Sequence, residues 1–271
     1  MSSSKCQGET VDAAGMPTES ACATAVVIGR AGSKGLPGKN IRSLGGRPMI
    51  WYTLERIERS RSVKRIILST DSPTLADQAA HCPLSLPLTY VARPPELARD
   101  DSSVQDVVRH AVASTGDDSG ICVVLYVNVP LRPVDLIDRA VDMLRRTGAD
   151  SVQSYVPSGT HHPWWQIRID EEARSLPWHH SVPDRRQDLP PAFAHDGGII
   201  AVTRASLFND GPPSGPHAFL GHDRRALVNR AGDVIDIDDA LDLHFAEAVL
   251  ASGTCDYELH ARPVGAGELL P

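Results

Sequence analysis

A short apolar strand followed at once by a basic, glycine-rich loop constrains this chain more than any other stretch. Residues 25–28, Ala-Val-Val-Ile, have the continuous apolar character of a buried parallel strand. The residues from Gly29 to Asn40 then include four glycines and the cations Arg30, Lys34 and Lys39. Glycine lets backbone N–H groups approach an anion closely, and Arg and Lys bind phosphate oxygens. The stretch therefore predicts a phosphate site rather than a solvated basic turn, which has no need of this glycine spacing.

Two common phosphate loops do not fit this stretch. A Walker loop would need Gly at position 33 and Ser or Thr at position 40, where Ser33 and Asn40 stand. A dinucleotide loop needs G-x-G-x-x-G, whereas two residues separate Gly29 from the next glycine. The loop must belong to another class of phosphate site.

Apolar runs alternate with helical patterns over most of the chain. Strands are expected at 25–28, 64–70, 87–91, 121–126, 150–155 and 197–203, and helices at 48–60, 73–80, 102–114, after Pro133 and at 239–250. Ser102 is the expected cap of the third helix. Residues 234–238 read as a last strand or turn. This alternation predicts an α/β fold with a mostly parallel sheet. Residues 156–195, rich in Pro, Trp and His, predict an irregular arm or lid.

Composition limits the class of protein. The chain has 271 residues and a net charge of −7, which argues against a nucleic-acid binder. No apolar run approaches the roughly 18–20 residues of a membrane span. Residues 1–22 lack the pattern of a signal peptide and are expected to form a disordered extension, with a globular domain at 23–252 and a tail at 253–271. Five scattered cysteines without a C-x-x-C pair suggest a reducing, cytoplasmic setting.

The loop from Arg30 to Asn40 resembles the CTP-binding loop of the acylneuraminate cytidylyltransferase family. The resemblance extends over nearly all of residues 24–250 and includes the segments 93–98, 130–132, 161–163 and 236–238. It implies a Rossmann-like nucleotidyltransferase domain that moves CMP from CTP to an acidic acceptor and releases pyrophosphate. It also implies Mg²⁺ as cofactor and a homodimer joined through a protruding arm at about 156–195.

The resemblance also assigns roles to particular residues. Charge on the phosphates would be stabilised by Arg30, Lys34 and Lys39; the nucleotide would be bound by Asn40, Arg93, Ser102 and Ser103; the acceptor would face Tyr126, Asn128, Trp165, Arg186 and Gln187; and magnesium would be bound by Asp236 and Asp238. In an extended strand the last two carboxylates point to one side, which favours a cation between them. The alternative is a solvated acidic turn in which Asp238 or Asp239 caps the last helix. The pair His161 and His162 is expected to pack within the arm, because no third zinc ligand is evident.

Two departures from the family pattern bear on the acceptor. Tyr126 stands where the family has a Gln that contacts a sugar acid, and Trp165 stands where several sialic-acid enzymes have a Lys. Bulky aromatics at both positions favour a small acceptor, and our prediction is a phosphonate such as phosphonoformate, as in antibiotic biosynthesis. The alternatives are a nonulosonic acid such as sialic acid, and an inactive CTP-binding regulator.

Overall fold

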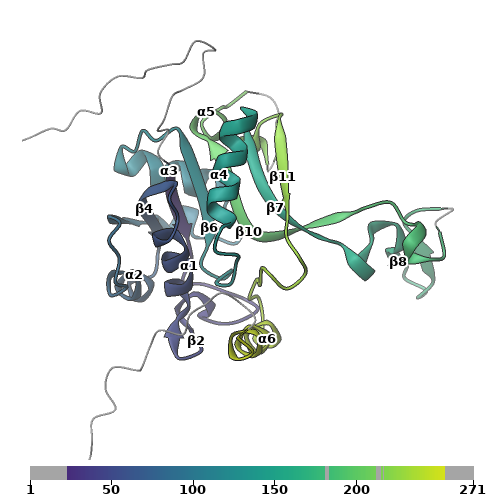
Figure 1. The fold of residues 1–271 in the computed structure, drawn as a ribbon. Helices are drawn as coiled ribbons and strands as arrows, with labels where there is room; N and C mark the ends of the chain where they lie inside the picture. Colours follow the sequence, from purple (N-terminus) through teal and green to yellow (C-terminus); the bar gives the residue numbers. More distant parts are fainter. Residues whose placement is uncertain (1–22, 181–182, 212–214, 216, 254–271) are drawn as a thin grey trace, which may run out of the picture.

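A computed structural model describes residues 23–180, 183–211, 215 and 217–253 (Figure 1). The expected extension at 1–22 and all but the first residue of the expected tail lie outside these ranges. The core is a seven-stranded sheet with strand order β11-β7-β10-β6-β1-β4-β5. Its strands are β1 (Ala23–Ile28), β4 (Val63–Thr70), β5 (Leu88–Ala92), β6 (Ile121–Tyr126), β7 (Ser151–Pro157), β10 (Phe193–Thr203) and β11 (Arg224–Val228).

The sheet is mostly parallel, as the alternation of strands and helices predicts. β1 pairs in parallel with both β4 and β6, β4 pairs in parallel with β5, and β7 with β11. β10 is the exception, since it runs antiparallel to β6 and β7. The parallel strands β1, β4 and β6 have their carboxyl ends side by side. Open α/β folds bind their ligands at the carboxyl ends of such strands.

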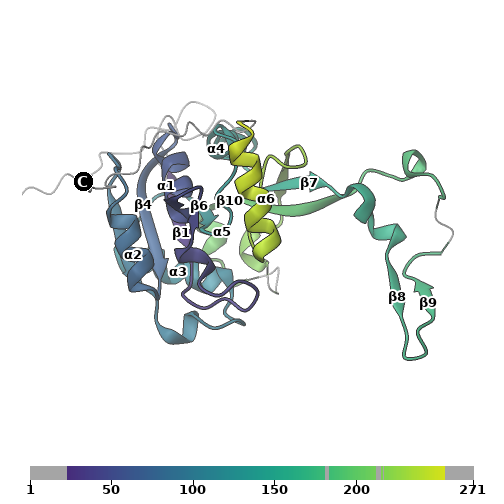
Figure 2. The ribbon, with the colours of Figure 1, turned by 90° about the horizontal axis from the view of Figure 1, so that it is seen from below.

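Helices cover both faces of the sheet (Figure 2). Ala25 and Val27 of β1 belong to a core with α1 (Met49–Glu58), α2 (Pro73–Ala80) and α4 (Leu136–Thr147). The alternate residues Val26 and Ile28 pack on the other face against α3 (Val104–Thr115) and α5 (Arg204–Leu207). Because successive side chains of a strand point to opposite faces, a strand buried on both sides must be apolar throughout. In the described residues, no helix is both long and apolar enough to cross a membrane.

A third core joins segments that lie far apart in the chain. Helix α6 (Ala240–Ala251) packs Ala246 and Leu250 in one cluster with Leu44 of β2 (Ser43–Leu44), the short strand that pairs with β3 (Arg47–Pro48). Leu36 of the glycine-rich loop and Ile237 of the acidic segment belong to the same cluster. This packing brings the first and last motifs of the sequence together.

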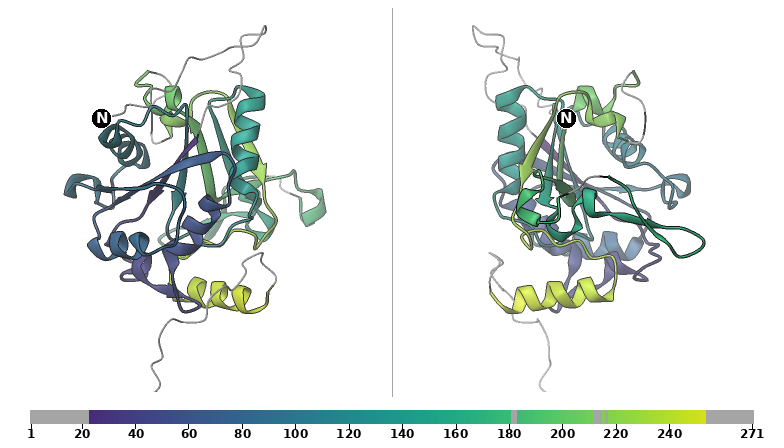
Figure 3. Two further views of the ribbon diagram at one scale, coloured as in Figure 1. Left: turned by 60° about the vertical axis from the view of Figure 1, so that its left-hand side comes forward. Right: turned by 90° about the vertical axis from the view of Figure 1, so that its right-hand side faces the viewer.

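The arm protrudes from the sheet (Figures 1 and 3). β7 and β10 continue their pairing into its base, through partners such as Phe193 and Pro157. Its far part contains the hairpin of β8 (Ile167–Ile169) and β9 (Ser175–Pro177), with 3₁₀ turns at Gly159–His161, Pro163–Trp165 and Arg186–Asp188. The arm is thus more regular than expected, and within one chain it extends outward instead of covering the sheet.

Two further sequence expectations need correction, and two elements were not foreseen. Ser103, not Ser102, caps α3, because its Oγ accepts the N–H of Asp106 at 3.0 Å. Residues 234–238, expected as a strand or turn, form neither; Ile235 makes one isolated bridge with Leu131. Strand β11 and helix α5 were not expected at all. The alternative cap of the last helix is confirmed, since the Asp239 side chain accepts the N–H groups of Leu241 and Asp242.

Candidate active site

The glycine-rich loop and the acidic segment lie in direct contact. A Cβ added to Gly35 would stand 2.6 Å from the backbone oxygen of Asp238, closer than real Cβ atoms approach any atom. From the same loop, Lys39 Nζ lies 2.6 Å from the Asp238 carboxylate. Gly35 is therefore needed because it has no side chain, which lets the two segments approach closely; it does not adopt a left-handed backbone conformation.

Two side chains hold the loop in shape. The carboxylate of Asp71, which follows β4, accepts the backbone N–H of Ala31 at 2.8 Å. Asn40 is 3% exposed and donates its amide to the carbonyl oxygen of Arg30 at 2.9 Å. Since a buried polar side chain that bonds the backbone fixes the path of the chain, Asn40 shapes the loop from within. Its expected contact with the nucleotide stays a prediction.

The loop cations face carboxylates. Arg30 and Lys34 both form ion pairs with Asp100, in the second case at 2.5 Å. Hydrogen bonds from Lys34 and Arg30 hold the pKa of Asp100 below its ordinary value. Lys34 is 85% exposed, so its ammonium group can leave Asp100 for another anion with little cost to the fold. The sequence gives no sign of this contact between Asp100 and the loop cations.

Asp236 lies beside several residues of the site. Its Oδ1 accepts the side-chain N–H of Asn128 at 2.5 Å. Gly197, with φ of 71°, lies against its other oxygen, because a Cβ there would stand 3.8 Å from Oδ2. Asp236 is exposed to solvent on one side and covered by the protein on the other. Desolvation by the covering residues, together with the charge of Asp238, raises the pKa of Asp236 to about 6. Burial and the charge of Asp236 raise the pKa of Tyr126 to about 12, so the phenol stays protonated beside this carboxylate.

The two carboxylates fit a magnesium ion in chemistry, although their backbone is not the strand that the sequence suggests. Two acidic groups close enough to raise a pKa repel each other, and a divalent cation between them would remove that repulsion. Among the described residues, no group of three or more His, Cys, Asp or Glu side chains is placed to bind a metal. Mg²⁺ requires no such cage, since one or two carboxylates with substrate phosphates and waters suffice.

The side chains of Arg93, Ser102 and Ser103, expected to bind the nucleotide, make hydrogen bonds within the protein. Arg93, 8% exposed, donates to the oxygen of Ser69 at 2.7 Å and to its hydroxyl at 3.3 Å. Burial lowers the pKa of Arg93, and the charge of Asp71 opposes that shift. Ser102 Oγ donates to the oxygen of Glu96 at 3.0 Å, while Ser103 caps α3. These bonds place the three side chains beside the ends of β4 and β5, and their nucleotide contacts stay predictions.

The expected acceptor residues divide into two groups. Tyr126 and Asn128 lie next to Asp236, whereas Trp165, Arg186 and Gln187 lie on the protruding arm (Figure 1). The indole of Trp165 donates to the oxygen of Pro183 at 3.0 Å, and Arg186 and Gln187 are exposed. His162 is 4% exposed and bonds the oxygen of Pro190, which agrees with packing inside the arm. Within one chain the arm residues do not reach the glycine-rich loop.

Comparison with known proteins identifies the family. The profile of the family described as cytidylyltransferase matches residues 24–163, about half of the chain. The chain belongs to the cytidylyltransferase family. Its members are nucleotidyltransferases, so the chain is an enzyme of that class, and the expected family is confirmed.

Individual relatives narrow the comparison. A CMP-N,N'-diacetyllegionaminic acid synthase of Legionella pneumophila is 32% identical over 238 residues, which cover 83% of this chain and 95% of that protein. An N-acylneuraminate cytidylyltransferase of Streptococcus agalactiae is 30% identical over 188 residues, which cover 68% of this chain but 44% of that longer protein. Among solved structures, a CMP:2-keto-3-deoxy-manno-octonic acid synthetase complexed with CTP has a TM-score of 0.65 at 18% identity, covering 85% of this chain and 99% of that one. The last comparison confirms the Rossmann-like nucleotidyltransferase fold.

Proposed function

We propose that this cytidylyltransferase moves CMP from CTP to a carboxylated sugar acid of the nonulosonate type and releases pyrophosphate. The observation that carries the proposal is the contact between the glycine-rich loop and the Asp236–Asp238 segment, which puts the cation Lys39 beside the carboxylates that we assign to magnesium. The Legionella relative, matched over nearly its whole length, supports the sugar-acid acceptor. The sequence-based preference for phosphonoformate receives no such support, and its alternative is the better hypothesis.

The loop residues supply charge for the transfer. Arg30 and Lys34 would exchange Asp100 for the β- and γ-phosphates of CTP, because a polyanion offers them more negative charge than one carboxylate. The whole side chain of Lys39 is only 16% exposed, and its ammonium group lies close to Asp238. There it would face the phosphate nearest to the metal. Negative charge grows on the leaving pyrophosphate in the transition state, so fixed cations there lower the barrier.

The carboxylates of Asp236 and Asp238 would hold Mg²⁺. When bound, the ion would supply a Lewis acid that neutralises phosphate charge. Asn128 would keep Asp236 in place, because its amide already fixes one carboxylate oxygen and leaves the other beside Gly197. The acceptor hydroxyl would attack the α-phosphorus as the bond to pyrophosphate breaks, and its proton would pass to solvent.

The acceptor site is completed, in this proposal, by the arm of a second copy. The arm exposes large apolar side chains, with Ile169 at 70% and Trp178 at 63% exposure, as expected of an interface in a homodimer. Arg186 and Gln187 of one copy would then reach the other copy's Tyr126 and Asn128, and Arg186 would bind the acceptor carboxylate through two hydrogen bonds.

Within one chain, Trp165 and Tyr126 do not share a pocket, as a small acceptor site built by both rings would need. Trp165 lies on the arm, where its indole donates to the oxygen of Pro183, so only the arm of a second copy would bring a Trp165 to the pocket of Tyr126. Tyr126 alone is beside Asp236 in the same chain. A single aromatic ring at the base of the site can pack against a sugar as readily as it excludes one.

Pyrophosphate release tests the proposal directly. The full-length protein with CTP and Mg²⁺ is offered N-acetylneuraminate, a legionaminic-type acid, 2-keto-3-deoxyoctonate and phosphonoformate in separate reactions. We expect turnover with a sugar acid and none without an acceptor. Turnover with phosphonoformate alone would restore the first acceptor hypothesis, and release of pyrophosphate with no acceptor would contradict the transfer reaction itself. Arg186→Ala should remove sugar-acid turnover, whereas Arg168→Ala, a change of the same kind on the neighbouring hairpin, should not.

A further inference from the structure

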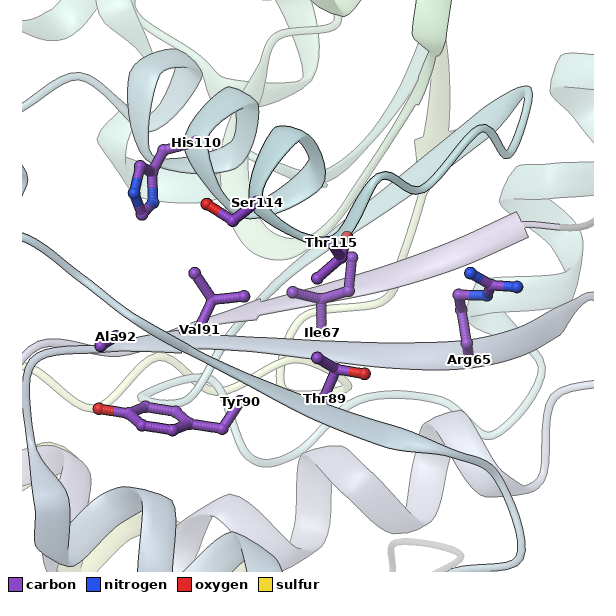
Figure 4. A pocket seen from close by; sticks show the side chains of 9 residues that line it. All are labelled: Arg65, Ile67, Thr89, Tyr90, Val91, Ala92, His110, Ser114 and Thr115. Atoms are coloured by element: carbon purple, nitrogen blue, oxygen red, sulfur yellow. The ribbon is translucent and has the colours of Figure 1, made fainter. Parts of the chain in front are cut away.

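The hollow between helix α3 and the strands β4 and β5 shares no residue with the candidate active site (Figure 4). More of its lining is polar than apolar. The wall residue Ile67 is 1% exposed and Nδ1 of His110 is buried, so neither offers a ligand much surface. The hollow therefore has no clear ligand chemistry. A carboxylate beside the active site, Asp196, has well-defined contacts that the proposed transfer does not use.

The carboxylate of Asp196 bonds three groups of the protein. Its Oδ1 accepts the hydroxyl of Ser154 and the backbone N–H of Gly198, the latter at 2.9 Å. Its Oδ2 accepts the side-chain N–H of Asn229 at 2.7 Å. All three groups donate, so an ionised carboxylate, which only accepts, suits this position. Since both oxygens are engaged within the protein, Asp196 serves the fold rather than a bound molecule.

The two side chains that bond Asp196 are themselves fixed. Ser154 is 2% exposed, and its Oγ accepts the backbone N–H of Ile199 at 3.0 Å. Asn229 is 4% exposed, and its side-chain oxygen accepts Nη2 of Arg139, on helix α4, at 3.3 Å. Turning this amide over would set its NH₂ group against the guanidinium, donor against donor. Asn229 therefore presents its N–H to Asp196 in one orientation only.

These bonds fix a bulge of β10 that lies against the metal carboxylate. Between the paired residues at 195 and 200, β10 has four residues where β7 has one. Gly197 in this bulge has φ of 71°, and a Cβ there would stand 3.8 Å from Oδ2 of Asp236 and 3.3 Å from the side chain of Val129. Asn128 bonds the other oxygen, Oδ1. The bulge is thus the neighbour of the oxygen that is left for a metal ion, and it keeps its shape through the N–H groups that Asp196 and Ser154 accept.

We propose that Asp196 is a positioning residue of the metal site. It touches neither the ion nor the substrates. It fixes the bulge at 196–199, and the bulge sets the space beside Oδ2 of Asp236. Residues that orient a metal ligand from outside change metal affinity by about 10–100-fold, and the lower value is expected where the effect passes through backbone. The inference rests on the proposed function, because it takes Asp236 as a magnesium ligand.

Exchanging Asp196 and Asn229 tests the assigned bonds. In Asp196→Asn, one orientation of the new amide sets an N–H against the N–H of Asn229, and the other sets it against that of Gly198. In Asn229→Asp, two carboxylates would meet instead. The double variant Asp196→Asn/Asn229→Asp restores a donor opposite an acceptor, and the carboxylate at 229 still accepts from Arg139. It also keeps the net charge of the wild type.

Binding of Mn²⁺ to the full-length protein with CTP and no acceptor measures the metal site without turnover. Relaxation of water protons separates Mn²⁺ held by the slowly tumbling protein from Mn²⁺ on free CTP. We expect Asp196→Asn to weaken binding by about tenfold and the double variant to return within about threefold of the wild type. Asp142→Asn, the same loss of charge at a side chain 62% exposed on α4, should bind as the wild type does.

Thermal unfolding of each variant separates positioning from stability. A merely structural Asp196 would lower the melting temperature and leave the Mn²⁺ affinity of the folded protein unchanged, which would refute the proposal, as would an exchange that restores nothing. If Asp196→Asn does not fold, Ser154→Ala removes one bond to Asp196 without loss of charge and should weaken Mn²⁺ binding by about threefold. Unchanged binding in that variant would refute the proposal equally. A wild type that binds no Mn²⁺ would contradict the metal site itself, and with it the proposed function.

Discussion

Gly35→Ala is the sharpest perturbation of the contact on which the site depends. The added methyl group would stand 2.6 Å from the backbone oxygen of Asp238, and real Cβ atoms essentially never come nearer than 3.0 Å. Because a backbone oxygen cannot rotate away, the two segments must separate by at least about 0.4 Å. That shift acts on the elements that hold Lys39 and Asp238 at 2.6 Å.

The cost can be divided between stability and catalysis. Forcing one methyl group into a filled contact costs about 1–3 kcal/mol, which lowers the melting temperature by roughly 2–12 °C in a domain of this size. Displacement of catalytic groups by about half an ångström lowers turnover by roughly tenfold, since a full ångström can cost about a hundredfold. Well below its melting temperature the variant stays folded, so the loss of stability alone would leave turnover unchanged. We therefore expect turnover at saturating CTP to fall by more than the loss of stability explains.

Gly32→Ala is the matched control, because it lies in the same loop and a Cβ there meets nothing within 4 Å. Thermal unfolding without substrates should leave this variant at the wild-type melting temperature. Pyrophosphate release then measures turnover of Gly35→Ala. An unchanged melting temperature together with unchanged turnover in Gly35→Ala would refute the close contact. An equal thermal loss in Gly32→Ala would mean that loop flexibility, not contact with Asp238, is what the glycines provide.

Three further predictions concern the carboxylates, the pH and the arm. Asp236→Asn should lower turnover by about a hundredfold or more while melting at or above the wild-type temperature, as thermal unfolding and pyrophosphate release would show; a large thermal loss would contradict a metal-binding role. Because the pKa of Asp236 is raised to about 6, a proton competes with Mg²⁺ for this carboxylate in mild acid. Half-maximal turnover should therefore need more Mg²⁺ at about pH 5 than at about pH 7.5. An equal Mg²⁺ requirement at both pH values would count against Asp236 as a metal ligand. Ile169→Asp on the arm should convert a dimer to a monomer in light scattering and Tyr90→Ser should not; a wild-type monomer at micromolar concentration would exclude the proposed assembly.

The sign of the pH effect on folding is opposite to that of an ordinary salt-bridged carboxylate. The pKa of Asp236 is higher in the folded protein than its value of 3.8 in a free side chain. Protonation therefore favours the metal-free fold, and this contribution is lost as the pH rises through about 6. Added Mg²⁺ should oppose the loss, and Asp236→Asn should remove the pH dependence of this group.

Local patterns predicted the centre of the fold well and its edges poorly. β1 and β6 are continuous apolar runs buried on both faces, so their sequence alone identifies them. β11 was missed because it is an edge strand with four of its five residues exposed, and two of these are arginines. The start of β10 was missed because pairing of Phe193 with Pro157 depends on partners far away in the chain. Long-range pairing leaves no periodic signal in the segment itself.

In the candidate site too, the single motifs can be predicted from the sequence, but the contacts between them cannot. The glycine-rich loop and Asp236 are evident from the sequence as motifs, but their contact is not, because Gly35 and Asp238 lie about two hundred residues apart. Asn128 was assigned to the acceptor, while the structure bonds its amide to Asp236. The ion pairs of Asp100 with Arg30 and Lys34 have no sequence signature either, since they depend on how two loops meet at the sheet edge.

The most direct test of the central hypothesis is the identity of the product. The protein is incubated with CTP, Mg²⁺ and equal amounts of N-acetylneuraminate, a legionaminic-type acid and phosphonoformate, and the products are resolved by mass spectrometry. We expect one cytidine monophosphate conjugate of a sugar acid, formed with one pyrophosphate and absent when UTP or ATP replaces CTP. A conjugate of phosphonoformate as the main product, or equal use of ATP, would contradict it.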